Sequence, residues 1–284
     1  MTPDLRLLKP ALDDLYCRYD RAAALADPIE IVRRYQDPAD REVAGFLAAA
    51  LAFGRVASVL QTVERVMAVL GPSPARAVRG FEPARDAPSI RPIVHRWSRG
   101  DDIVALVWIV GRMLEAAGSI ESFFTDGDDE SGEDLGPTLE SFGRRALAFD
   151  LRPVYAGRRP RPGVAYFFPC PSTGSACKRL NLFLRWMVRH DAVDLGVWKR
   201  VRPSRLVIPL DTHVIRVGRC LRLTARRSPG WAMATDITRS LRELDSDDPV
   251  RYDFALCHLG MHGLCGFGTP RGDQQCPLKG LCRP

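Results

Sequence analysis

The sequence has no apolar run that approaches the ~20 residues needed to cross a bilayer. Its start, MTPDLRLLKPALDDLY, carries acidic side chains and lacks the long apolar core of a secretory signal. Both absences favour a soluble, cytoplasmic protein that has no contact with a membrane. Eight cysteines in such a chain argue against a disulfide framework and leave two alternatives, buried thiols or metal ligands.

No segment shows the alternation of apolar and polar residues that is typical of β-strands, and no internal repeat is present. Apolar residues instead recur at helical spacing, which predicts an all-α protein. Gly54 is expected to divide the longest segment into two helices, and Asp248 before Pro249 is a helix-start signal. The predicted helical segments are 4–26, 40–70, 101–114, 137–149, 213–221, 231–244 and 249–259.

The 284-residue chain is long enough to bury a substantial core, and its formal charge of +7 suits a polyanionic partner. The acidic segment 125–136 has no core residues and is predicted to be a solvated, mobile loop. The basic, proline-broken segment 151–163 fits a solvated connector better than a phosphate-contacting one.

Two short stretches carry the strongest chemical signals. GSACKRLNLFLRW places Lys178 near the start of an apolar helix, where the helix N-terminus, neighbouring cations and partial burial favour a neutral, nucleophilic amine. IPLDTHVIRV places Asp211 directly before another helix, where an ionised carboxylate can stabilise a developing cation or accept a proton. Taken singly, each residue also has a simpler explanation: Asp211 as a helix cap and Lys178 as a surface charge.

These stretches resemble the helix-hairpin-helix base-excision DNA glycosylases of the endonuclease III type. In that comparison Lys178 matches the catalytic lysine and Asp211 the catalytic aspartate. Two features depart from the family: Ala176 and Thr173 replace a hairpin glycine and a proline, and the interval between lysine and aspartate is longer. Over most of its length the chain is similar to a bacterial family of unknown function that is distantly related to these glycosylases. The DNA-contacting residues that the resemblance implies are Gly174, Ser175 and Ala176 of the hairpin, together with Arg179.

The resemblance also implies a two-lobed fold. Residues 39–202 would form a helical lobe that ends in the hairpin and the lysine helix, and residues 203–284 would pack with residues 1–38 as the second lobe. The active site would lie between the lobes, with Lys178 and Asp211 facing each other.

The implied activity is DNA repair. Lys178 would displace a damaged base, flipped out of the duplex, through a Schiff base, and the same imine would give abasic-site lyase activity. The alternative is a noncatalytic nucleic-acid-binding protein that retains the fold. DNA is the expected ligand, RNA is not excluded, and the protein is expected to be a monomer. The sequence does not identify the damaged base.

The C-terminal tail holds a cluster of four cysteines, Cys257, Cys265, Cys276 and Cys282. Four thiolates can bind zinc or a [4Fe-4S] cluster, and the tail resembles that of the cluster-containing glycosylases. Ten residues without cysteine separate Cys265 from Cys276, so one ligand of the family pattern is missing from its place. Cys257 or His262 could substitute for it. The alternative is that no metal binds and Cys257 is a core residue.

Overall fold

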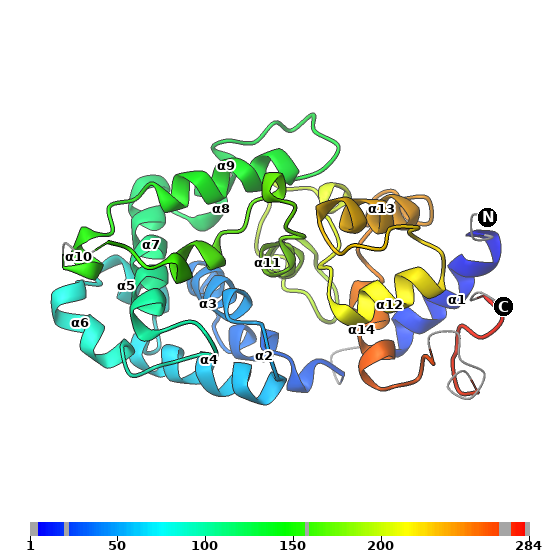
Figure 1. The fold of residues 1–284 in the computed structure, drawn as a ribbon, viewed down its shortest axis with the longest axis horizontal. Coiled ribbons are helices and arrows are strands. Elements are labelled where there is room, and N and C mark those ends of the chain that lie inside the picture. The colour runs from blue at the N-terminus through cyan, green and yellow to red at the C-terminus, as the bar shows by residue number, and fades with distance from the viewer. Residues whose placement is uncertain (1–4, 20–22, 157–158, 267–273, 282–284) are drawn as a thin grey trace.

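The computed structural model describes residues 5–19, 23–156, 159–266 and 274–281. Within these ranges the chain forms helices joined by loops, with two isolated β-bridges and no β-strand (Figure 1). The prediction of an all-α protein is confirmed. No helix in the described part of the chain combines the length and apolarity needed to span a membrane.

A group of helices surrounds α7, which is buried along most of its length. Gly111 allows α5 to approach α7 closely, because a Cβ there would lie 2.3 Å from the carbonyl oxygen of Val78. The helices of this group are α3 (Pro38–Ala50), α4 (Val56–Leu70), α5 (Pro74–Arg79), α6 (Pro83–Ile90), α7 (Gly100–Ala117), α8 (Ile120–Thr125), α9 (Gly136–Leu147) and α10 (Arg152–Tyr155).

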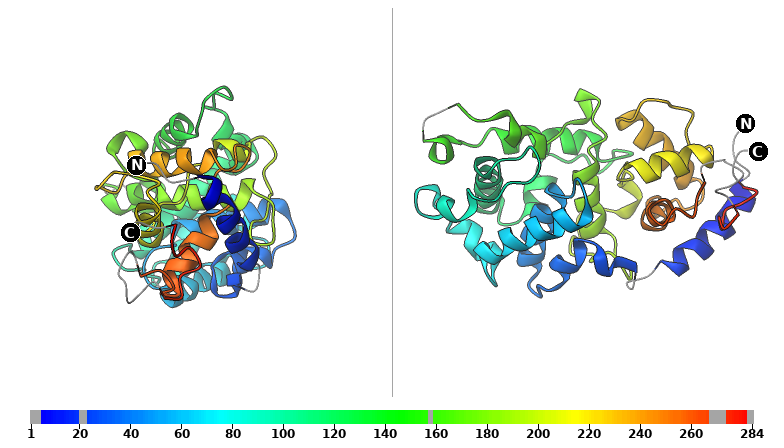
Figure 2. Two further views of the ribbon diagram at one scale, coloured as in Figure 1. Left: turned by 90° about the vertical axis from the view of Figure 1, so that its right-hand side faces the viewer. Right: turned by 60° about the horizontal axis from the view of Figure 1, so that its bottom comes forward.

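A second group of helices lies on the right of Figure 1, opposite the group that surrounds α7. Here α14 packs against α12 and α1, and Figure 2 shows α1 beside the C-terminal helices. The short α2 (Ile29–Arg33) packs against α3 of the first group instead. The proposed division into lobes at residue 202 stays a prediction. The second group contains α1 (Leu5–Arg18), α12 (Thr212–Cys220), α13 (Trp231–Arg242) and α14 (Asp253–Met261).

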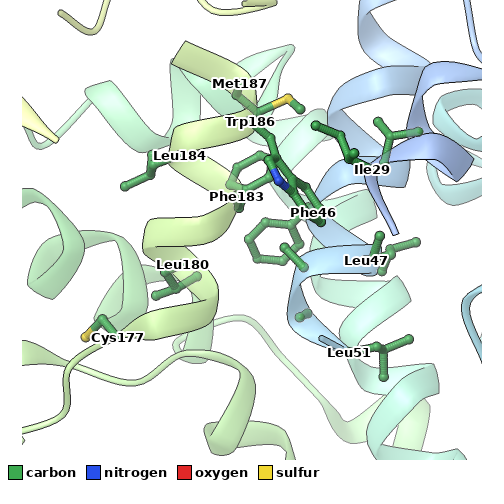
Figure 3. Close-up of a cluster of buried hydrophobic side chains, with 14 of the residues drawn as sticks. Ile29, Phe46, Leu47, Leu51, Cys177, Leu180, Phe183, Leu184, Trp186 and Met187 are labelled. Carbon is green, nitrogen blue, oxygen red and sulfur yellow. The ribbon is translucent and has the colours of Figure 1, made fainter. Parts of the chain in front are cut away.

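Helix α11 (Lys178–Val188) lies between the two groups (Figure 1). One face packs against α3, where the rings of Phe46 and Phe183 meet edge to face with centroids 5.1 Å apart (Figure 3). Gly45 makes room for Met187, since a Cβ there would lie 2.9 Å from the methionine methyl group. This apolar contact fixes α11 against the first group.

Buried ion pairs fix α11 against the second group. Arg185 pairs with Asp253 of α14 and with Asp194, and Arg189 pairs with Asp194 and Asp248. Removal of one partner from such a pair leaves a buried charge uncompensated, so each of these contacts is expected to be costly to break.

Three expectations about segments need correction. The N-terminal helix ends at Arg18. The helix expected from residue 249 begins at Asp253, and the Asp248 side chain accepts hydrogen bonds from Arg189 instead of capping it. The acidic segment is more than a solvated loop: Asp128 accepts bonds of 2.7 and 2.9 Å from the buried Arg205. The separation of α3 and α4 at Gly54 is confirmed, and the φ of Gly54 is +102°.

Candidate active site

A pocket of about 1060 Å³ opens where α11, α12 and α14 meet the loop that follows α3. A volume of this order accommodates a nucleotide-sized ligand. Its walls come from both helix groups, and the side chains that matter below are Asp27, Lys178, Asp211, Asp253 and Cys257.

Lys178 is the first residue of α11 and lines the pocket. The chain has four lysines, Lys9, Lys178, Lys199 and Lys279, and Lys178 alone among them lines the pocket in the described structure. A primary amine at the wall of a cavity of this size is a candidate nucleophile.

The hairpin before Lys178 is built as a tight turn. A 3₁₀ turn, η3 (Pro171–Thr173), leads into Gly174, whose φ of +80° favours glycine. The carbonyl of Gly174 accepts a hydrogen bond from the N–H of Trp231, and the Ser175 hydroxyl accepts one from Cys177 N–H. Ala176, at the position of the missing hairpin glycine, is not among the positive-φ residues, so this backbone does not require glycine there.

Cys177, directly before Lys178, is a packing residue. Its φ is +48°, its thiol donates to the carbonyl of Pro169, and burial raises the pKa of the thiol to about 12. A thiol held in this protonated form is a poor nucleophile. Cys177 is therefore not a candidate nucleophile.

Arg179 points away from the hairpin. It is buried, its guanidinium donates to the carbonyls of Ala50 and Tyr166, and burial lowers its pKa to about 10. Its contact with DNA stays a prediction, and its bonds to Ala50 and Tyr166 hold the end of α3 against the pocket wall.

Asp211 lies at the start of α12, as predicted, and each of its carboxylate oxygens has a partner. Oδ1 accepts a bond of 2.7 Å from Val214 N–H and caps the helix. Oδ2 accepts a bond of 3.0 Å from the thiol of Cys257. The two contacts fix the carboxylate at the pocket wall.

Cys257 and Asp253 are four residues apart on α14 and face the pocket together. Burial and the charges of Asp211 and Asp253 raise the pKa of Cys257 well above its usual value, and the charge of Lys178 opposes this shift. Cys257 is thus a protonated hydrogen-bond donor whose sulfur lies within electrostatic reach of both Lys178 and Asp211.

Asp253 is a site residue that the sequence reasoning missed. One oxygen accepts from Arg185 and the other, Oδ1, is buried without a hydrogen-bond partner. Burial raises the pKa of Asp253 to about 6, and the nearby charge of Asp211 adds to the shift while Arg185 opposes it. A carboxyl group with this pKa can exchange a proton near neutral pH. No sequence signal marked it, because its environment is assembled from three helices.

Asp27 adds another carboxyl to the pocket from the segment before α2. Oδ1 accepts a bond of 3.0 Å from Ile29 N–H. Burial raises the pKa of Asp27, against the bond from Ile29 and the charges of Arg185, His258 and Lys178. The pocket thus places carboxyl groups from three separate segments around one lysine.

Three of the four tail cysteines lie in the described residues. Cys257 faces the pocket, Cys265 and Cys276 are buried, and Cys282 lies outside the described residues. In the part of the chain that the structure covers, no three His, Cys, Asp or Glu side chains are placed to hold a metal ion. The Cys257 thiol donates a hydrogen bond to Asp211 here, and the metal ligand set stays a prediction.

The raised pKa of Asp253 predicts a pH-dependent stability. The value of about 6 lies above the ordinary 3.8, so the folded state binds the proton more tightly than the unfolded state. The stabilisation of the folded state by protonated Asp253 is complete below about pH 4 and is lost as the pH rises through about 6. Compared with Asp253→Asn, the wild type should lose up to about 3 kcal/mol of unfolding free energy over this range, at about 1.4 kcal/mol per pKa unit. Urea unfolding at a series of pH values measures the difference.

Asp245 provides the control for this prediction. Its bonds to Arg251 and to backbone N–H groups lower its pKa against the effect of burial, so its contribution is lost as the pH falls. Asp245→Asn should give the opposite pH trend. A flat difference between wild type and Asp253→Asn from about pH 4 to pH 7 would contradict the assignment.

A family model described as "Protein of unknown function (DUF2400)" matches residues 27–262. The matched region includes all five pocket side chains named above. Neither the curated proteins nor the solved structures contain a match to the chain.

Proposed function

The chain belongs to the family described as protein of unknown function (DUF2400), and from the geometry of the pocket we propose that it is a DNA glycosylase with abasic-site lyase activity. The observation that supports this proposal is the meeting of Lys178 and Asp211 in one pocket, although 33 positions separate them in the sequence. A nucleophilic amine, a fixed carboxylate and a nucleotide-sized cavity are the parts that this chemistry requires.

In the proposed reaction the Lys178 amine attacks C1′ of a nucleotide whose base has been flipped into the pocket. The bond from C1′ to the base nitrogen breaks, and the base leaves with the electron pair and takes up a proton. Asp211 stabilises the positive charge that develops on the sugar. The sugar ring opens to an imine on Lys178, and loss of a C2′ proton expels the 3′ phosphate. Water then hydrolyses the imine and regenerates the amine.

Asp253 and Cys257 have supporting roles in this scheme. The Cys257 thiol holds the Asp211 carboxylate in one orientation. Asp253, with a pKa of about 6 and an unpaired oxygen, is the group suited to give a proton to the leaving base or to take one from the sugar. The net charge of +7 favours the approach of a polyanionic strand.

Borohydride trapping tests the proposal. Oligonucleotide duplexes that carry an abasic site, uracil, an oxidised pyrimidine or 8-oxoguanine are incubated with the protein and reductant. The expected result is a covalent protein–DNA adduct on the abasic duplex and on at least one damaged duplex, because reduction fixes the imine. If no duplex gives an adduct, Lys178 does not form an imine with DNA and the proposed mechanism is wrong.

The second candidate is a noncatalytic nucleic-acid-binding protein, with RNA as well as DNA among its ligands. The observation that favours it is the engagement of both Asp211 oxygens, one in the helix cap and one with Cys257. DNA or RNA binding that persists with no strand cleavage on any substrate would establish this function in place of the enzyme.

For the tail, we propose a structural metal, zinc or a [4Fe-4S] cluster, held through Cys265, Cys276 and Cys282. Iron and zinc analysis of anaerobically prepared protein should give a stoichiometric metal content, with a brown colour if iron is bound. Cys276→Ser should lower that content, whereas Cys257→Ser should keep it, because Cys257 contacts Asp211. If the wild-type protein contains no metal, the cysteines of the tail are packing residues.

A further inference from the structure

A tight turn from His95 to Ser98 displays an exposed tryptophan. The backbones of His95 and Ser98 bond to each other in both directions, at 3.0 and 2.9 Å. Trp97, inside the turn, is 47% exposed. The other tryptophans are buried or half-buried: Trp108, Trp186, Trp198 and Trp231. An aromatic side chain of this size is normally buried, so its display needs an explanation.

Trp97 belongs to a preformed aromatic cluster. Its ring stacks on Phe53 with centroids 4.8 Å apart and an interplanar angle of 26°, and it meets Tyr166 edge to face at 5.3 Å. Tyr166 is also exposed, at 41%. Arg179 supports the cluster, with its guanidinium 4.0 Å from the Tyr166 ring centroid. We call Phe53, Trp97 and Tyr166 the aromatic platform.

The turn under the platform is strained and rigidly anchored. Arg96 has a φ of +54°, in the left-handed region that non-glycine residues seldom adopt. The buried His95 holds the turn: its Nε2 donates to the carbonyl of Phe53 at 2.8 Å, and its Nδ1 lies 3.0 Å from the Thr62 hydroxyl. The strain persists because these contacts fix both sides of the turn.

The platform is continuous with the proposed active site. Phe53 and Tyr166 line the pocket, and Trp97 extends the same aromatic surface beyond its edge. The side chain of Arg96 lies over the Trp97 ring at 4.8 Å and Arg55 is exposed nearby in sequence to Phe53, so cations accompany the aromatic rings. Aromatic rings with cations beside them suit a strand in which bases stack and phosphates carry the charge.

We propose that the aromatic platform is a stacking site for an unpaired nucleobase of the strand whose neighbouring nucleotide enters the pocket. The proposal rests on the proposed function only in taking DNA as the ligand, and it requires no chemistry at Lys178. The protein should then prefer substrates with unpaired bases beside the lesion, such as single strands, overhangs or bubbles. Stacking on an aromatic ring accepts any base, so the site contributes affinity without sequence selection.

The test compares two oligomers of equal length, twelve-nucleotide poly-dT and a twelve-unit abasic phosphodiester, on protein that carries Lys178→Ala to prevent covalent reaction. Poly-dT should bind more tightly, since both ligands have the same charge and only poly-dT has bases. Adding Trp97→Ala should weaken poly-dT binding by about 5- to 150-fold, the range for the loss of one stacked base. Binding of the abasic oligomer should be unchanged.

Trp97→Phe is the matched control, because it keeps a ring that can stack. It should retain poly-dT affinity within about threefold while losing the quenching of tryptophan fluorescence that poly-dT causes in the parent protein. Thermal unfolding of both variants is measured beside the parent: Trp97→Phe keeps an aromatic contact with Phe53 and Tyr166, and a cooperative transition in Trp97→Ala shows that lost binding reflects lost stacking and not an unfolded protein.

Equal affinity of Trp97→Ala and the parent for poly-dT would overturn the proposed stacking site. Exposed aromatic surfaces also bind proline-rich peptides, so Trp97 fluorescence quenched by such a peptide and not by poly-dT would overturn it too. Trapping experiments on wild-type protein report separately on the lysine chemistry. An adduct with no effect of Trp97→Ala rejects the platform alone. Trp97-dependent binding with no adduct rejects the enzyme alone.

Discussion

Lys178→Ala should abolish the borohydride adduct and slow the nicking of an abasic strand by on the order of 10³-fold or more, the scale seen when a covalent nucleophile is removed. The side chain lies at the N-terminus of α11 and lines the pocket, and the variant leaves no other lysine there in the described structure. Gel analysis of trapped product and single-turnover nicking rates measure the effect. Alanine is a strong helix former, so α11 should persist.

Lys199→Ala is the matched control for this variant. Lys199 donates from Nζ to the carbonyl of Gly196 and does not line the pocket. It should keep both adduct formation and nicking within about twofold of the wild type, an estimate that follows from the small effects of substitutions away from a site. An adduct that survives Lys178→Ala would show that another amine, such as the chain's N-terminal amine, is the nucleophile.

Asp211→Asn should slow nicking and base release by about 10²- to 10⁴-fold, the contribution usual for a positioned acid or base. Asparagine is as good an N-cap as aspartate, so its amide oxygen can still accept the Val214 N–H bond and α12 should remain intact. The expected result is a large loss of rate with an unchanged thermal unfolding temperature. The variant removes the charge and keeps the cap.

Asp211→Ala separates the two roles of this residue. It should show a similar loss of rate and, in addition, lose about 1 kcal/mol of stability from the missing cap. If Asp211→Asn nicks abasic DNA as fast as the wild type, Asp211 is a structural cap only, and the proposed stabilisation of the cationic sugar is wrong.

The Cys257 contact shows how the same residue type can serve two different ends. In the sequence Cys257 belongs to a C-terminal cluster of thiols and so indicates a metal ligand. In the structure its helix turns the thiol toward Asp211, with Sγ 3.0 Å from Oδ2. The direction of a side chain around a helix axis depends on what the helix packs against, and α14 packs on both α12 and α1.

Most of the helical architecture was predictable from local patterns. The 3.6-residue spacing of apolar side chains identified α7, α9, α12 and α13 to within a few residues, and Gly54 marked the break between α3 and α4. In one case where the prediction was wrong, the local signal is used in a contact with a distant segment. Asp248 reads as a helix cap in sequence, but its carboxylate is used by Arg189, 59 positions earlier.

The sequence by itself determined the all-α class, the basic character and the helix starts at Lys178 and Asp211, because these depend on composition and on neighbours within one or two helical turns. Only the tertiary structure decided that Lys178 and Asp211 share a pocket, that Asp253 carries a pKa of about 6, and that Trp97 stacks on Phe53 and Tyr166. Each of these follows from burial and from charges or rings brought together across tens of residues. Such effects depend on distance in space, which the spacing of residues along the chain does not specify.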